Sequence, residues 1–116
     1  MLVRKDLFTK LDGFDEYFFM YIEDMEFCYR VKKLGYAVYY YPKTKVIHLG
    51  YGSSNRSFAI IQIYKGLPYF FKKHKGYIQY LLVIILLRLK AIIAILIGVL
   101  TKNTYLVKTY KQAMEF

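Results

Sequence analysis

Two adjacent acidic residues and one distant histidine are the residues of this chain whose types suit chemistry. Glu23 and Asp24 stand at the start of a predicted helix, and His48 follows downstream. A carboxylate can accept the proton of a hydroxyl group, and an imidazole can bind a metal ion or transfer a proton. Structural alternatives stay open, because an acidic residue at a helix start often only caps the helix, and a histidine between aliphatic residues often belongs to a core.

A helix from about residue 22 to residue 34 is predicted to carry the acidic pair. Its apolar side chains recur at spacings of four and three residues and form one face, which comprises Phe27, Val31 and Leu34. Gly35 is a typical residue for ending a helix, and Arg30 follows Glu26 at the spacing at which opposite charges pair. We expect an amphipathic helix with Asp24 at its N-terminal end.

Two strands are predicted after this helix. Residues 36–41 form a tyrosine-rich run that ends at Pro42, and residues 44–48 form a second short strand. Strands rise by about 3.3 Å per residue and helices by about 1.5 Å, so the returning strands match the helix in length. Asp24 and residues 41–48 would then share one end of an α/β arrangement.

Loops and later helices complete the prediction. Residues 14–19 form an aromatic-rich loop of the kind that often builds site walls, which makes Phe14 and Asp15 candidate substrate-binding residues. Asn55 or Ser57 can cap a helix that Pro68 is expected to bend. His74 lies among lysines, and we interpret it as a solvated surface residue.

Composition and charge indicate a packed or membrane-contacting chain. The 116 residues are 57% hydrophobic with a net charge of +10, and residues 51–116 hold ten Lys or Arg against Glu115 alone. Such a basic half attracts anionic lipid or nucleic acid, and its apolar neighbours favour an anionic membrane surface over nucleic acid. The single Cys28 indicates a reduced compartment, and no signal peptide is recognised at the start, so we expect the cytoplasmic side.

Residues 81–100 form an apolar run that two cations, Arg88 and Lys90, interrupt. Fifteen Leu, Ile or Val residues contribute about −0.3 to −0.6 kcal/mol each towards insertion, whereas each central cation costs about 2.5 to 3.5 kcal/mol. Insertion is therefore marginal. Helices that lie in the interface, with both cations extending to lipid headgroups, fit equally well, and we favour peripheral attachment.

Three segments together resemble a known family. They are residues 13–24 (GFDEYFFMYIED), 29–36 (YRVKKLGY) and 46–54 (VIHLGYGSS). In this order and spacing they resemble the C-terminal half of family 2 glycosyltransferases, especially bacterial rhamnosyltransferase-like members. The resemblance implies the α/β nucleotide-binding fold called GT-A. The family's Asp-x-Asp motif and first βαβ units are not recognised, so the chain resembles a fragment without the N-terminal, nucleotide-binding half.

The resemblance also implies roles for individual residues. Asp24 matches the catalytic base, which takes a proton from the acceptor hydroxyl, and Glu23 would position it or contact the acceptor. His48 matches a ligand of a divalent metal, Mg or Mn, in some members. Phosphate contacts would come from a glycine and hydroxyl loop and the residue that follows it, namely Gly52, Ser53, Ser54 and Arg56; the loop is equally well explained as a turn before a helix.

The resulting hypothesis is a fragment of an inverting glycosyltransferase at the cytoplasmic face of the bacterial cell membrane. Residues 1–56 would form the acceptor and catalytic half, and residues 57–116 would form kinked, membrane-associating helices. The complete enzyme would transfer a sugar, with rhamnose suggested by the resemblance, from a nucleoside diphosphate sugar to a polysaccharide or lipid-linked acceptor. The fragment alone would be inactive. The competing hypothesis is a non-catalytic basic amphipathic module that binds membranes and has no use for Asp24 or His48.

Overall fold

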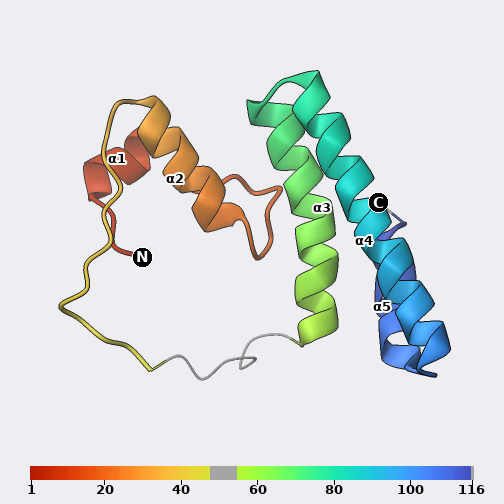
Figure 1. The fold of residues 1–116 in the computed structure, drawn as a ribbon. Helices are drawn as coiled ribbons and strands as arrows, with labels where there is room; N and C mark the ends of the chain where they lie inside the picture. Colours follow the sequence, from red (N-terminus) through yellow and green to blue (C-terminus); the bar gives the residue numbers. More distant parts are fainter. Residues whose placement is uncertain (48–54, 116) are drawn as a thin grey trace.

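The described part of the chain is helical. The computed structural model describes residues 1–47 and 55–115, and these residues contain five α-helices (Figure 1). The helices are α1 (Lys5–Lys10), α2 (Glu23–Lys33), α3 (Arg56–His74), α4 (Tyr77–Leu100) and α5 (Thr104–Ala113). Helices α3, α4 and α5 pack together, and α1 and α2 form a smaller unit beside α3.

The predicted amphipathic helix is confirmed as α2. Phe27 and Val31 are buried and pack with Leu7 of α1, which closes a small core between these two helices. Gly35 follows the helix with a φ of +82°, a left-handed conformation that glycine adopts without strain. Leu34 is exposed instead of joining the apolar face, because it caps the helix at its end.

The predicted α/β fold of the GT-A class is wrong for the described residues, which contain no strand and no sheet. Residues 36–47 lack helical structure, and their apolar side chains face solvent; Ile47, for example, is 92% exposed. A strand is stable only when a neighbouring strand pairs with its backbone N–H and C=O groups. No described segment offers that pairing, so the β propensity of this tyrosine-rich run has no ladder to join (Figure 1).

A second core holds α3, α4 and α5 together. Its buried residues are Tyr64, Ala91, Tyr110 and Ala113. The Tyr64 hydroxyl donates a hydrogen bond to the backbone carbonyl of Leu87 at 3.0 Å, and the Tyr64 ring packs edge-on against Tyr110. Burial, together with the nearby Tyr110 hydroxyl, raises the pKa of Tyr64 to about 12. One residue of α3 therefore joins all three helices.

The start and the interior of α3 agree with local sequence signals. Asn55 caps the helix, since its side chain accepts a hydrogen bond from the backbone N–H of Phe58 at 2.8 Å. Pro68 lies inside α3 and the helix continues beyond it to His74. Helix α4 has 24 residues and a mean hydropathy of 2.7 over its most apolar window, so by length and composition alone it could cross a membrane.

Candidate functional site

A strained turn positions the acidic pair. Tyr21 and Ile22, which directly precede α2, both have positive φ angles, 66° and 72°. A left-handed conformation is rare for a β-branched residue such as Ile22 and costs about 1–3 kcal/mol. The surrounding packing must hold this turn, and the turn fixes Glu23 as the first residue of α2.

Glu23 and Asp24 occupy different environments in the first turn of α2. Asp24 is exposed, and one of its carboxylate oxygens, Oδ1, accepts a hydrogen bond from the backbone N–H of Met25 at 2.7 Å. Glu23 is half-buried, and its Oε2 atom is buried without a hydrogen-bond partner among the described residues. Buried polar atoms without a partner are rare and unfavourable, so the turn also holds this oxygen at a cost in free energy. The partial positive charge at the N-terminus of α2 stabilises the negative charges of both Glu23 and Asp24.

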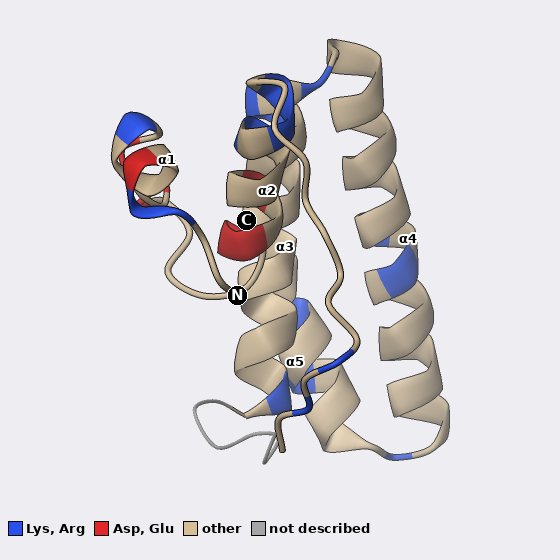
Figure 2. Cartoon of the chain, turned by 90° about the vertical axis from the view of Figure 1, so that its left-hand side faces the viewer, with Lys and Arg blue, Asp and Glu red and all other residues tan. Residues whose placement is uncertain are grey.

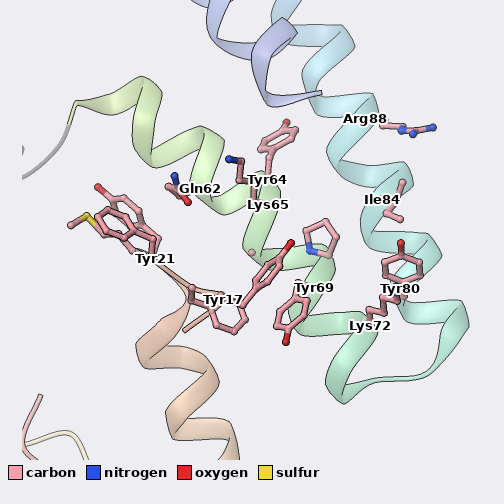
Figure 3. Close-up of a pocket in the computed structure, with 15 residues that line it drawn as sticks. Tyr17, Tyr21, Gln62, Tyr64, Lys65, Tyr69, Lys72, Tyr80, Ile84 and Arg88 are labelled. Carbon is pink, nitrogen blue, oxygen red and sulfur yellow. The ribbon is translucent and has the colours of Figure 1, made fainter. Parts of the chain in front are cut away.

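The chain before this turn forms one wall of a cleft of about 730 Å³ (Figure 3). Residues 17–21 line one side, and α3 and α4 supply the other. The lining of the cleft is rich in aromatic rings, among them Tyr17 of the loop and Tyr69 of α3, which stack with their ring centroids 3.7 Å apart. Three basic side chains also line the cleft: Lys65, Lys72 and Arg88. Its size and lining suit a ligand that has both apolar and anionic parts.

Gly66 allows the aromatic loop to lie close against α3. A Cβ atom at this position would come within 3.2 Å of the Phe18 ring and 3.3 Å of the Ile22 side chain. Phe18 is buried there, and its ring packs edge-on against Tyr69. The strained turn is therefore held by packing against α3 at Gly66, where the helix has no side chain.

Glu26 anchors α2 to the C-terminal end of α3. Its side chain is fully buried, and its carboxylate accepts hydrogen bonds from Arg30 Nε at 2.8 and 2.9 Å and from Lys73 Nζ at 3.2 Å. His74 Nε2 lies 2.8 Å from the same carboxylate. Desolvation opposes ionisation of this group, but the hydrogen bonds from His74, Arg30 and Lys73 outweigh it, so the pKa of Glu26 lies below its usual value.

The pairing of Glu26 with Arg30 is confirmed, whereas the interpretation of His74 as a solvated residue is wrong. Only 6% of the His74 side chain is exposed. The Tyr29 hydroxyl also donates to the backbone carbonyl of His74 at 3.2 Å. Glu26 and His74 are 48 positions apart, and no local pattern in the sequence brings them together.

Two predicted substrate-binding residues hold the loop in place. Asp15 accepts a hydrogen bond from Lys73 Nζ at 2.7 Å and another from the backbone N–H of Tyr17 at 3.0 Å. Phe14 packs its ring against Phe27, with the centroids 5.3 Å apart. Their contacts are those of structural residues, and their role towards a substrate stays a prediction.

The other predicted site residues lie at the beginning of α3 or before it. Arg56 is the first residue of α3 and is exposed. The rings of Phe19 and Phe58 lie 6.2 Å apart, which brings the aromatic loop next to the first turn of this helix. The remaining predictions, for His48, Gly52, Ser53 and Ser54, lie outside the described residues.

The described residues do not assemble a metal site. No group of three or more His, Cys, Asp or Glu side chains is close enough there to hold a metal ion. Glu23 and Asp24 alone do not supply the ligand set that Mg²⁺ or Mn²⁺ requires. The divalent metal therefore stays a prediction, and we assign no chemical step to it.

Comparisons with known proteins give partial matches to glycosyltransferases. The chain is 41% identical over 58 residues to the rhamnosyltransferase WbbL of Escherichia coli (strain K12), a match that covers 50% of this chain and 22% of that protein. It is 42% identical over 48 residues to the N-acetylglucosaminyl-diphospho-decaprenol L-rhamnosyltransferase of Mycobacterium tuberculosis (strain ATCC 25618 / H37Rv), covering 41% of this chain and 16% of that protein.

The matched region spans less than a quarter of either relative. No family model matches the chain, and no solved structure matches it. The partial identities nevertheless support a relationship between this chain and glycosyltransferases.

Proposed function

We propose that this chain contributes the acceptor and catalytic part of an inverting glycosyltransferase that uses a nucleoside diphosphate sugar as donor. The observation that carries the proposal is the exposed Asp24 carboxylate, placed by a strained turn in a segment that resembles glycosyltransferases. Partial identity to two named rhamnosyltransferases supports the transferase class. Rhamnose is the sugar that those names suggest.

Asp24 acts as the general base in this proposal. The acceptor hydroxyl attacks the anomeric carbon of the donor sugar, its proton passes to Asp24, and the bond from that carbon to the diphosphate oxygen breaks. The nucleoside diphosphate departs from the opposite face. An exposed carboxylate is accessible to such a hydroxyl. Glu23, the neighbouring residue, would position Asp24 or contact the acceptor.

The aromatic and basic cleft is the proposed acceptor site. One relative's name specifies an acceptor that carries a diphosphate on a decaprenol lipid. In this chain, Lys72 and Arg88 can bind phosphate oxygens, while the rings of Tyr17 and Tyr69 offer apolar surface to a sugar or a lipid chain. The cleft wall of residues 17–21 leads directly into the turn before Glu23 and Asp24. In this proposal the reacting sugar therefore lies beyond the end of this wall, since neither Glu23 nor Asp24 lines the cleft itself.

A nucleotide-binding half outside this chain completes the proposed enzyme. Residues 51–116 carry a strongly basic charge, which favours binding at an anionic membrane surface on the cytoplasmic side. Phosphate contacts from Arg56 and the loop before it, and a metal bound with the help of His48, belong to the same proposal. The chain alone would not turn over the donor.

The test compares sugar-nucleotide turnover by the chain joined to its nucleotide-binding half, with Asp24 and with Asp24→Asn. We expect turnover to fall about 10²- to 10⁴-fold while donor binding is retained. Asp6→Asn is the matched control, because Asp6 is also an exposed acid in the first turn of a helix. If Asp24→Asn turns over as fast as Asp6→Asn, Asp24 is only a helix-start carboxylate and not the base. If the parent protein neither turns over nor binds the donor, the non-catalytic membrane-binding module becomes the better explanation.

A further inference from the structure

Helix α4 presents an unbroken apolar face on the side away from the protein. Successive residues of an α-helix are turned by about 100°, so the position of each side chain around α4 follows from its number. Leu87, Ala91 and Gly98 fall on the side that packs against α3 and α5. The opposite side is exposed and consists of aliphatic residues over the whole length of the helix: Ile78, Leu82, Ile85, Leu86, Leu89, Ile93, Leu96 and Leu100.

The two cations of α4 lie at the margins of this face. Arg88 and Lys90 are turned by about 200° from one another, so they leave the helix on nearly opposite sides. Leu89 lies midway between them and points outward. Both cations are exposed, and no ion pair of either is found within the described residues. Figure 2 shows the basic residues of α4 gathered near the middle of the helix.

This arrangement is unfavourable for a helix that crosses a bilayer. Residues 88 and 90 stand at the middle of Tyr77–Leu100, so a spanning helix would place both charges at the bilayer centre. Charged residues at that depth normally pair with an opposite charge or face the interior of a bundle. Helices α3, α4 and α5 contain no Asp or Glu, so these elements offer no partner.

The same arrangement suits a helix that lies in the plane of a membrane surface. The outward aliphatic side chains would enter the acyl region along the whole helix. Arg88 and Lys90 would then stand at one common, shallow depth on the two flanks, where lipid phosphates lie. The ten basic residues in 51–116 against a single Glu make an anionic surface the complementary partner.

We propose that α4 lies flat in the headgroup region of an anionic bilayer, with its aliphatic face towards the acyl chains and Arg88 and Lys90 bound to lipid phosphates. This orientation concerns membrane binding and does not depend on sugar transfer. The assay below needs no donor or acceptor, so its failure is distinguishable from failure of the proposed enzyme activity.

The test measures the depth of three positions on the aliphatic face. In the full chain with Cys28→Ser, single cysteines replace Leu82, Leu89 or Leu96 in turn and carry a fluorescent probe. These positions follow one another at seven-residue spacing and lie on the same side of α4. Vesicles of phosphatidylethanolamine and phosphatidylglycerol contain lipids that quench fluorescence at known depths. A flat helix gives one shallow depth for all three probes.

A spanning helix gives a different result, because positions seven residues apart would differ in depth by about 10 Å. A depth profile of that size, with Leu89 deepest, overturns the proposal. Absence of binding to these vesicles by the unlabelled chain overturns it as well. The double change Arg88→Leu with Lys90→Leu removes the charges that favour the surface, and we expect it to convert the flat profile to the spanning one. Lys102→Leu with Lys108→Leu, outside α4, should leave the flat profile unchanged.

Discussion

Replacing Glu26 by glutamine tests whether one buried carboxylate attaches α2 to the rest of the molecule. The side chain is fully buried and interacts with three basic groups: Arg30 on its own helix and Lys73 and His74 on α3. Outside this cluster, α2 meets α3 through few side chains, chiefly Tyr29 against Phe70 and His74. Removing the charge should therefore release α2 without disturbing the core of α3, α4 and α5.

The expected magnitude follows from the contacts that change. A hydrogen bond to a charged group contributes about 1 kcal/mol more than a bond between neutral groups, and three donors share this carboxylate, which gives about 3 kcal/mol. Lys73 is 36% exposed and regains part of its hydration when released. We expect the free energy of opening α2 to fall by about 2–3 kcal/mol, which lies at or just below the cost of breaking a buried ion pair.

Amide hydrogen exchange is the suitable assay because it resolves individual helices. A loss of about 2–3 kcal/mol should accelerate exchange of the α2 amides by about 30- to 150-fold. Amides of α4 near Ala91 should be unaffected, since they belong to the other core. Glu16→Gln is the matched control, because Glu16 is exposed in the loop before α2. Equal exchange rates of the α2 amides in Glu26→Gln and Glu16→Gln would show that the Glu26 carboxylate does not hold α2 in place.

Three further predictions concern the same packing. Gly66→Val should push Phe18 and Ile22 away from α3 and destabilise the strained turn by about 1–3 kcal/mol, measured as faster proteolysis between residues 17 and 22. Burial raises the pKa of Tyr64 to about 12, above the value of about 10 that it has when unfolded. The stabilisation that results from this difference is therefore complete below pH 10 and is lost as the pH rises to about 12. Urea titrations at pH 9 and 11 should show this fall in the free energy of unfolding for the parent chain and a smaller fall for Tyr64→Phe. Burial opposes ionisation of Asp15 and Glu26, but hydrogen bonds that they accept, including those from Lys73, lower the pKa of both. Their contribution is therefore present above their unfolded pKa values and is lost as the pH falls through the folded ones. Circular dichroism during acid titration should show this as a loss of α2 helix, and Glu26→Gln should make the helix content of α2 less dependent on pH.

The features predicted correctly from the sequence are local. The helix that became α2, its pairing of Glu26 with Arg30 and the Asn55 cap all depend on residues three or four positions apart. Such spacings determine geometry within a single helix, so the pattern carries enough information.

The features that the sequence did not predict depend on distant partners. The strand predicted over residues 36–41 reflects real β propensity, but a strand also needs a neighbour that the described residues do not provide. The lysines beside His74 in the sequence predict a surface residue, but the packing of α2 against α3 places its ring against Glu26. The left-handed turn at Tyr21 and Ile22 contains no glycine, so no local signal in the sequence predicts it. Tertiary packing against Gly66 maintains its conformation.

Arg88 connects the proposed acceptor site with the proposed membrane orientation. Its side chain lines the aromatic and basic cleft and also stands at one margin of the aliphatic face of α4. If α4 lies flat, the side of the cleft formed by α4 is at the depth of the lipid headgroups. A lipid-linked acceptor holds its phosphates at that depth while its hydrocarbon tail stays in the bilayer. Such an acceptor would enter the cleft by lateral diffusion, and its sugar would point along residues 17–21 towards Asp24 without the tail leaving the membrane.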